Sequence, residues 1–465
     1  MPSKRKIYFR ADAGPNIGYG HYIRSLALAD MLKQDFDCTM FTQTPSEYQL
    51  REAEGICAIV ALPEDDSKFD KFLEYLMGDE IVVLDNYFYT TEYQQQIKDK
   101  GCKLVCIDDI HDRRFVADVV INHGMVPAEE YDVADYTQVF TSPKYALLRS
   151  PFLQQQPIAK RSGSWVVTIG GLDEPNITTL AVKTLQETGA TEITAIVGDG
   201  FKHRQVLEET GVKILSRLTA QQMAETFAAA ENVLCCASTV CYEALSQGCR
   251  VYAGWYVDNQ LEIYAGLKKN RYVMPLENLA DLKSDLLLQN VQVEELLFDK
   301  VRNRIKGIFV CMASEMVNYV DMSEEQSRQV WECRNIKEIR VCMTNPEPFS
   351  FESHQQFLHS LKGNTSKLYM ALFFNDRFAA SYDLVVIEPG TKAERGLFVN
   401  PEFQGMGLGE YLEKQMVAIA RANYGVHRLL AEVLKSNPRS LHYHEAVGYR
   451  VVREDDTYYY LEKKV

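Results

Sequence analysis

A glycine-rich turn near the N-terminus holds residues that could bind an anion and move a proton. In RADAGPNIGYGHYIRSLALAD, the glycines Gly14, Gly18 and Gly20 precede His21 and Arg24 at the expected start of a helix. Small residues let a backbone approach a ligand, and a helix N-terminus offers free N–H groups to an anion. A histidine titrates near neutrality and can take a proton from water. The alternatives are a plain tight turn and a histidine that only caps the helix or fills a core.

A second glycine-rich turn, in GLFVNPEFQGMGLGEYLEKQ, has the spacing Gln404-x-x-Gly407-x-Gly409. It follows a run typical of a strand and opens a run typical of a helix. Successive N–H groups of such a turn could hold phosphate oxygens. A P-loop is excluded because no Gly-Lys-Ser/Thr follows. The alternative is a flexible glycine loop.

Between these turns, two strand ends carry small and polar residues. Gly170 and Gly171 end the apolar run SWVVTIGG, and Ser238 and Thr239 lead into YEALSQG, with Glu243 one turn further along. We expect Ser238 and Thr239 to cap that helix and to face phosphate oxygens. The alternative is that they are caps only and that Glu243 lies on a solvated surface.

Up to about residue 275, the elements that position these residues follow one repeating sequence pattern. Near-continuous apolar runs alternate with amphipathic stretches, which indicates parallel sheets covered on both faces. We expect two doubly wound, Rossmann-like domains, at residues 1–150 and 151–325, joined by the Gln-, Pro- and Ser-rich segment RSPFLQQQPIAKRSGS. Residues 276–329 are expected to be mostly helical. Tandem domains of this kind bind ligands in the cleft between them.

A third domain is expected at residues 330–465, where the predicted strands and helices follow in a different order. The pair YMALFF and RFAASYDLVVI, separated by Asn375 and Asp376, predicts a β-hairpin. The strand GLFVN, the glycine turn, a helix, the strand LLAEVL, another helix and the strand DTYYYLEKKV follow. This order indicates an α+β domain.

The bulk composition excludes several classes of partner. The 465 residues carry a net charge of −14, which argues against nucleic acid and anionic membrane as main partners. The eleven cysteines form no Cys-x-x-Cys pair, so we expect reduced, buried thiols and no metal site. No segment has the length and apolarity of a signal or a membrane span, and we expect a cytoplasmic protein.

Seven ordered motifs resemble the UDP-sugar hydrolases of pseudaminic acid synthesis, relatives of the glycosyltransferase-B enzymes. They are RADAGPNIGYGH, VVLDNY, IDD at 107–109, YALLR, IGGLD, ASTVCYEAL and DNQ at 258–260. The resemblance implies a glycosyltransferase-B arrangement of the first two domains. It also implies inverting hydrolysis of a UDP-linked diacetamido-trideoxyhexose to UDP and free sugar, without a metal.

The same resemblance implies roles for individual residues. The catalytic histidine falls on His21, and Tyr87 and Asn259 match residues of the sugar site. Residues expected to bind the substrate are Gly18, Gly20, Arg24, Gly170, Gly171, Ser238, Thr239, Glu243 and Gln260. Relatives commonly carry polar residues at the positions of Cys241 and Tyr242, so the exact sugar stays open.

The third domain resembles the GNAT acetyltransferases, which implies acetyl-CoA as co-substrate. In that superfamily the strand before the glycine turn lends backbone groups to the pantetheine arm. Tyr443 matches a tyrosine that often acts as general acid, with a core tyrosine as the alternative, while His442 and His444 are interpreted as surface residues. Residues expected to bind acetyl-CoA are Phe398, Val399, Gln404, Gly405, Met406, Gly407, Leu408, Gly409 and Asn437.

The start of this domain, WECRNIKEIRVCMTNPEPFSFESHQQFLHSL, resembles the acetyltransferase of the same pathway, through Arg334, Asn335 and His354. That enzyme acetylates the 4-amino group of a UDP-amino sugar. The favoured interpretation is therefore a bifunctional enzyme. Two alternatives remain: a glycosyltransferase that uses a UDP-sugar donor, and a non-catalytic UDP-sugar-binding module that serves the acetyltransferase.

Overall fold

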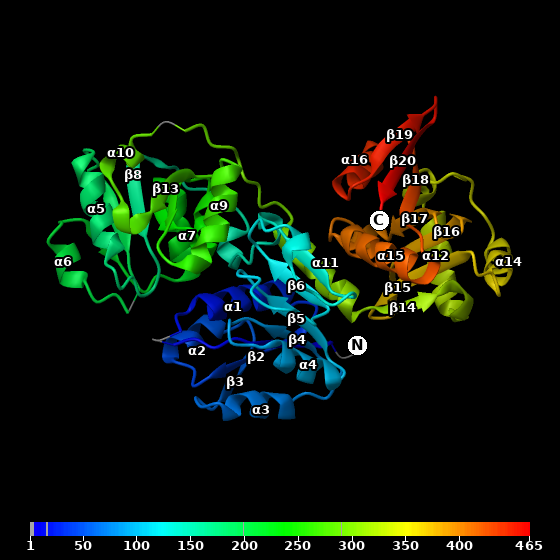
Figure 1. Ribbon diagram of the computed structural model, residues 1–465, viewed down its shortest axis with the longest axis horizontal. Coiled ribbons are helices and arrows are strands. Elements are labelled where there is room, and N and C mark those ends of the chain that lie inside the picture. Colours follow the sequence, from blue (N-terminus) through cyan, green and yellow to red (C-terminus); the bar gives the residue numbers. More distant parts are fainter. Residues whose placement is uncertain (1–3, 15–16, 199, 290) are drawn as a thin grey trace. The chain divides into compact units, whose positions relative to one another are not determined.

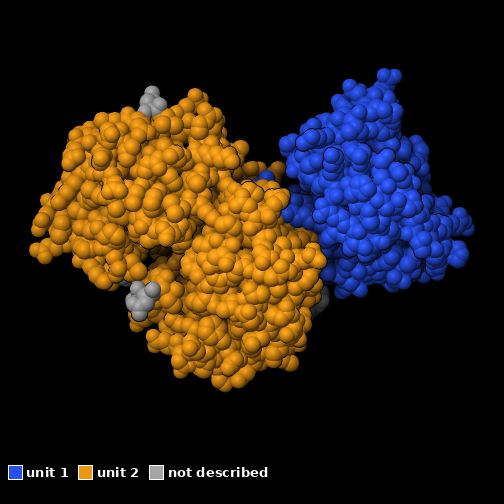
Figure 2. Space-filling model, viewed as in Figure 1, with its two compact units in different colours: residues 1–2, 303–465 blue, residues 3–302 orange. Residues whose placement is uncertain are grey.

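The computed structural model describes residues 4–14, 17–198, 200–289 and 291–465, so Pro15 and Asn16 of the first glycine turn lie outside the described residues. The chain forms two compact units, residues 3–302 and residues 303–465 (Figure 2). The parallel sheets predicted for two separate domains therefore lie in one unit. The C-terminal unit begins at residue 303, before the predicted residue 330, and it includes β14 (Glu315–Asn318), which pairs with β15 (Lys367–Phe374).

The first sheet has seven parallel strands in the order β3-β2-β1-β4-β5-β6-β7 (Figure 1). Strand β4 is apolar along its length, and β5 is apolar after its first residue, Lys103, because helices cover both faces of the sheet, as predicted. The last strand, β7, was not predicted. The strands are β1 (Lys6–Arg10), β2 (Asp37–Gln43), β3 (Ala58–Leu62), β4 (Ile81–Leu84), β5 (Lys103–Ile107), β6 (Val119–Asn122) and β7 (Gln138–Thr141), and the α-helices are α1 (Gly20–Leu32), α2 (Glu47–Ala53), α3 (Ser67–Glu74) and α4 (Thr91–Asp99).

The second sheet has six parallel strands in the order β10-β9-β8-β11-β12-β13. Five were predicted, and β13 lies at the start of the stretch that was expected to be helical. The strands are β8 (Arg161–Thr168), β9 (Ile193–Ile196), β10 (Lys213–Leu215), β11 (Ala230–Cys236), β12 (Arg250–Trp255) and β13 (Met274–Asn278), and the α-helices are α5 (Ile177–Glu187), α6 (Arg204–Glu208), α7 (Ala220–Ala229), α8 (Thr239–Ser246), α9 (Leu261–Lys269) and α10 (Ser284–Leu287).

Both sheets change direction at the strand that comes first in the chain. In the first sheet the order turns between β1 and β4, and in the second it turns between β8 and β11. In open α/β sheets the carboxyl ends of two such strands leave a crevice, because their connections run to opposite sides. The turns that follow β1, β4, β8 and β11 are therefore the places where this unit can receive ligands.

The C-terminal unit has one mixed sheet in the order β14-β15-β16-β17-β18-β20-β19. The predicted hairpin is confirmed: β15 pairs with β16, and Asn375 and Asp376 have the positive φ values that its turn requires. The remaining elements are α11 (Val301–Ala313), α12 (Glu324–Asn335), α13 (Lys337–Arg340), α14 (Phe351–Leu361), β16 (Arg377–Glu388), β17 (Lys392–Val399), α15 (Leu408–Tyr424), β18 (Arg428–Leu434), α16 (Pro438–Ala446), β19 (Arg450–Glu454) and β20 (Tyr458–Lys464).

Candidate active sites

His21 lies at the crevice of the first sheet, in the first turn of α1, and faces Asp85, the residue after β4. Its Nδ1 lies 2.8 Å from Asp85 Oδ1, and its side chain is 12% exposed. The Arg24 NH2 group also lies 3.1 Å from Nδ1, but it already donates to Asp85. A carboxylate can only accept, so the network assigns the proton to Nδ1 and leaves Nε2 as the basic nitrogen.

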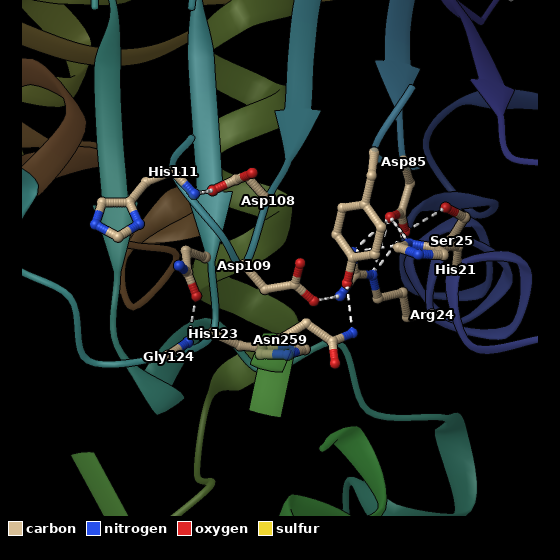
Figure 3. Close-up of polar contacts among 12 residues, drawn as sticks. His21, Arg24, Ser25, Asp85, Asp108, Asp109, His111, His123, Gly124 and Asn259 are labelled. Atoms are coloured by element: carbon tan, nitrogen blue, oxygen red, sulfur yellow. Dashed lines mark hydrogen bonds and ion pairs between the residues drawn. The ribbon is translucent and has the colours of Figure 1, made fainter. Parts of the chain in front are cut away.

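Arg24 ties this pair to a second carboxylate. Its guanidinium donates to both oxygens of Asp85 and, at 2.7 Å, to Asp109 after β5, as Figure 3 shows. Ser25 donates a further hydrogen bond to Asp85. Burial opposes ionisation of Asp85, but Arg24 and His21 outweigh it and lower the pKa of Asp85 to about 2. Asp85 is therefore an anion at any pH at which His21 could act.

Tyr87 and Asn259 close the other side of His21. The Tyr87 ring meets the His21 ring edge-on with centroids 4.6 Å apart, and Asn259 Nδ2 donates to the Tyr87 hydroxyl at 2.9 Å. Asn259 comes from the turn after β12, so residues 172 positions apart meet here. The structure thus brings together the three residues predicted to handle the sugar, and their roles stay predictions.

Asp85, Asp109 and His123 were missed as site residues by the sequence analysis. The motifs LDNY and IDD contain the two aspartates, and their positions directly after buried strands were a usable signal. His123 gave no such signal. It is buried, its Nδ1 has no hydrogen-bond partner among the described residues, and burial together with Arg24 lowers its pKa to about 4.

The second crevice contains the residues predicted to hold the diphosphate. Gly170 and Gly171 are exposed after β8, and Gly18 and Gly20 flank the start of α1 across the same unit. Ser238 occupies the N-cap position of α8, but the prediction that it caps the helix is wrong, because its side chain makes no capping hydrogen bond. The half-buried Thr239 begins the helix. The first N–H groups of α8 are therefore not satisfied by a side-chain cap.

Glu243 is buried in α8 and is not a solvated surface residue, which excludes that alternative. Arg149, in the motif YALLR, donates to both of its carboxylate oxygens at 2.7 and 2.8 Å. Gln260, directly before α9, is also buried and accepts a hydrogen bond from the Tyr256 backbone N–H. The pair formed by Arg149 and Glu243 joins the segment before the second sheet to the helix of its crevice.

The glycine turn of the C-terminal unit sits between β17 and α15. Gly405 and Gly407 have φ values of +79° and +76°, which other residues rarely adopt. Gly307 of α11 packs against this turn so closely that a Cβ there would overlap the Met406 carbonyl. Gln404 donates to Val399 O and accepts from Arg439. Contacts with Gly307, Val399 and Arg439 therefore fix the position of the turn.

Strands β17 and β18 part next to this turn. Their parallel pairing covers only residues 392–394 and 428–430, whereas β17 pairs with β16 as far as Val399. The β18-facing side of residues 396–399, including Phe398, therefore has no partner strand. An extended arm fits such an opening, and the phosphates of acetyl-CoA fit the N–H groups from Gly405 through Leu408 to Gly409. The residues present thus suit this co-substrate.

Tyr443 of α16 lies across the start of α15. Its hydroxyl donates to Gly409 O at 2.9 Å and accepts from Arg395 at 3.1 Å, and burial raises its pKa to about 12. Asn437 is the N-cap of the same helix and accepts from the Ser440 N–H. Tyr443 is therefore protonated at neutral pH, as a proton donor must be.

One expectation about its neighbours is wrong. His442 is exposed, but His444 is buried, because its ring packs against Tyr443 and Tyr449 and its Nε2 meets Arg395 at 3.1 Å. Helical periodicity explains the difference, since positions two apart point in different directions.

The three residues noted at the start of this domain have different environments. Asn335 ties α12 to the following loop through hydrogen bonds with the Phe349 backbone. His354 is buried, with no partner for Nε2 among the described residues, and burial lowers its pKa to about 4. Arg334 likewise has a buried, unpaired NH1 among those residues.

One cavity lies away from both candidate sites. It has a volume of about 710 Å³ and opens at the amino ends of β1, β2 and β3, the edge opposite His21, between Lys4–Lys6, Asp37–Cys38 and Cys57–Ala58. Within the described ranges, no cluster of three or more His, Cys, Asp or Glu residues could hold a metal ion. In that same part of the chain, no helix is long and apolar enough to cross a membrane.

Comparisons with known proteins assign the two parts to different relatives. Residues 334–449 match the acetyltransferase (GNAT) family. Acetyltransferase PseH of Campylobacter jejuni is 26% identical over 148 residues, which cover 32% of this chain and 91% of that protein. Its crystal structure with acetyl coenzyme A is 25% identical and covers 32% of this chain and 98% of that chain, with a TM-score of 0.27.

Two further relatives extend the match. The UDP-2,4-diacetamido-2,4,6-trideoxy-beta-L-altropyranose hydrolase of Campylobacter jejuni is 24% identical over 279 residues, which cover 57% of this chain and 97% of that protein. An uncharacterized protein of Methanocaldococcus jannaschii is 20% identical over 487 residues, 97% of each chain. The predicted resemblance to two enzymes is confirmed: this chain is an enzyme with one part similar to a UDP-sugar hydrolase and another part similar to GNAT acetyltransferases.

Proposed function

We propose that the chain catalyses two steps on one nucleotide sugar, in the cytoplasm and in the synthesis of pseudaminic or a related nonulosonic acid. The C-terminal unit acetylates a UDP-4-amino-4,6-dideoxy sugar. The N-terminal unit then hydrolyses the UDP-diacetamido-trideoxyhexose with inversion. The observation that carries the hydrolytic half is the pair of His21 and Asp85 at the crevice of the first sheet, facing Tyr87 and Asn259.

In the hydrolytic step, His21 Nε2 takes a proton from water while the water oxygen attacks the anomeric carbon. The bond from that carbon to the UDP oxygen breaks, and UDP leaves on the opposite face. Asp85 holds the imidazole in its orientation and stabilises the imidazolium that forms. Asn259 and Tyr87 lie beside the histidine, where the sugar ring would be held.

The diphosphate would lie at the second crevice. Gly170, Gly171 and the uncapped N–H groups of α8, beginning at Thr239, favour phosphate oxygens there. Glu243, already oriented by Arg149, would accept from the ribose hydroxyls. In this proposal the sugar lies between the two sheets, in the arrangement of glycosyltransferase-B enzymes. We therefore keep two domains within this unit, the first at residues 1–150 and the second from residue 151 to the end of the unit at residue 302, in place of the predicted 325.

In the acetylation step, acetyl-CoA supplies an activated acetyl thioester. The glycine turn binds its phosphates, and residues 397–399 of β17 bind its extended arm at the opening between β17 and β18. Tyr443 gives a proton to the departing sulfur, and Arg395, whose guanidinium donates to the tyrosine oxygen, keeps that hydroxyl in place.

The test gives the full chain UDP-4-amino sugars with and without acetyl-CoA and follows products by mass spectrometry and NMR. We expect the acetylated UDP-sugar first, then UDP and free diacetamido sugar, without an added acceptor. UDP release that needs a sugar acceptor would indicate a glycosyltransferase instead. Acetylation without any UDP release would favour a binding module in the N-terminal unit.

A further inference from the structure

A carboxylate lies over the backbone of β17 where this strand separates from β18. Asp383 of β16 is paired directly with Gly396 of β17. A Cβ at Gly396 would overlap the Asp383 carboxylate, so the side chain leans across β17 instead of standing upright on β16. Because β18 is the next strand in that direction, Asp383 points toward the opening between β17 and β18.

The position along the strand strengthens this observation. Pairing between β17 and β18 ends at Glu394 and Leu430, two residues before Gly396. The carboxylate is thus beside the first part of β17 that has no partner strand on that side. Glycine is the residue that lets it reach the opening, since any other side chain on that face would block it.

The surroundings of Asp383 allow its carboxyl group to gain or lose a proton near neutral pH. Burial raises the pKa of Asp383 to about 6, although Arg395 opposes the shift. The Asp383 carboxylate accepts from the Gly396 backbone N–H, and the side chain remains partly accessible. The charged or titratable groups that face it are Arg395 and Glu394 on β17, Arg334 on α12, Tyr369 on β15 and Tyr319 in the turn before α12.

We propose that Asp383 is the general base of the acetyl transfer, which takes a proton from the acceptor ammonium at the opening between β17 and β18. The proposal rests on the proposed acetylation of a UDP-4-amino sugar. An ammonium nitrogen has no free electron pair, so it must lose a proton before it can attack a carbonyl carbon. Asp383 is the carboxylate that the strand geometry directs to that place.

The step balances as follows. The ammonium gives one proton to Asp383, and its nitrogen pair then forms the N–C bond to the thioester carbonyl. The C–S bond breaks, the sulfur receives a proton from Tyr443, and the tyrosine recovers one from the nitrogen as the amide forms. Asp383 passes its proton to water, so the products are the amide, the free thiol of CoA and one proton.

The experiment compares the full-length wild type with Asp383→Asn and with Asp456→Asn, an exposed control on the same unit. We expect kcat for CoA release to fall by about 10²-fold or more at pH 7 in Asp383→Asn, within the usual range for a general base. Acetyl-CoA binding, measured by calorimetry, should stay within twofold, and Asp456→Asn should match the wild type.

The pH profile separates catalysis from structure. A base acts when it is deprotonated, so wild-type kcat should rise with pH through about 6 and then level off. Asp383→Asn should lose this rise and recover activity only where the amine itself is deprotonated. Because folding raises the pKa of Asp383, ionisation of this side chain costs stability, and the asparagine variant should melt no earlier than the wild type at pH 7.

The outcomes are distinguishable. A wild type that transfers no acetyl group to any UDP-amino sugar would refute the proposed function. A wild type that does so, with Asp383→Asn retaining kcat within threefold and the same pH profile, would overturn the role of Asp383. Loss of acetyl-CoA binding or of melting temperature in that variant would also overturn it, since it would indicate a structural residue.

Discussion

The two candidate sites are built from different kinds of groups. In the N-terminal unit, side chains do the work: His21, Arg24, Asp85 and Asp109 form one buried network at the ends of three strands. In the C-terminal unit, the backbone provides most of the site, through a glycine turn and a strand without a partner. A side-chain network depends on every member, whereas a backbone site tolerates substitution except at its glycines and at the few groups that move protons.

The comparison predicts its largest effect at His21. His21→Asn removes the base but keeps a polar side chain, so UDP release should fall by about 10⁴-fold, the upper end for general base catalysis. Acetyl transfer should be unchanged because it uses the other unit. UDP and CoA release are measured on the same preparation, with His427→Asn, an exposed histidine, as control. UDP release within tenfold of wild type would remove His21 as the base.

Asp85→Asn tests whether the side-chain network around His21 supports both catalysis and stability. The variant removes the group that orients His21, and we expect UDP release to fall by about 10³-fold. It also leaves Arg24 buried with a single anionic partner, which should lower the free energy of unfolding by about 3–5 kcal/mol. Kinetics and denaturant unfolding measure the two effects. An unaltered free energy of unfolding would contradict the inference that Arg24 depends on Asp85 for charge balance.

The same carboxylate gives a pH dependence of stability. The pKa of Asp85 is lowered to about 2, below its unfolded value near 4. Its contribution is therefore fully present above about pH 4 and is lost as pH falls toward 2. The melting temperature of the wild type should drop over this range. That of Asp85→Asn should drop less, and an equal drop in both proteins would contradict the assignment.

In the C-terminal unit, Tyr443→Phe should give a smaller loss. The ring stays in place beside Gly409 while the proton donor is removed, so kcat for acetyl transfer should fall by about 10²-fold with little change in KM for acetyl-CoA. Tyr459→Phe on β20 is the control. If kcat is retained, Tyr443 is a core tyrosine and not the proton donor. The C-terminal site would then have no side chain assigned to protonate the departing sulfur.

The smallest predicted effect concerns the backbone itself. Gly407→Ala imposes a side chain on a left-handed residue, at a cost of about 1–2 kcal/mol. We expect KM for acetyl-CoA to rise about tenfold, with UDP release unaffected. Gly390→Ala has the same backbone strain in a turn away from the site and should leave KM unchanged. Equal effects of the two variants would show that strain, not binding, is responsible.

Much of the fold followed from local pattern. The apolar runs of β1, β4, β5 and β11 and the turn at Asn375 and Asp376 were predicted because each is determined by neighbouring residues. Strands β7, β13, β14 and β19 were missed because each lies at or near a sheet edge, where a short, partly polar segment becomes a strand only by pairing. His444 was misassigned because its burial depends on Arg395 and Tyr449.

The sequence by itself determined the chemistry available: two glycine turns, a histidine after the first strand, a tyrosine in the last helix, and motifs shared with two kinds of enzyme. The tertiary structure alone decided which side chains meet. Asp85 reaches His21 because β4 lies beside β1, and Asp383 reaches the opening because its pairing partner on the neighbouring strand β17 is a glycine, Gly396. Strand order and register are set by long-range packing, which no local pattern of residues records.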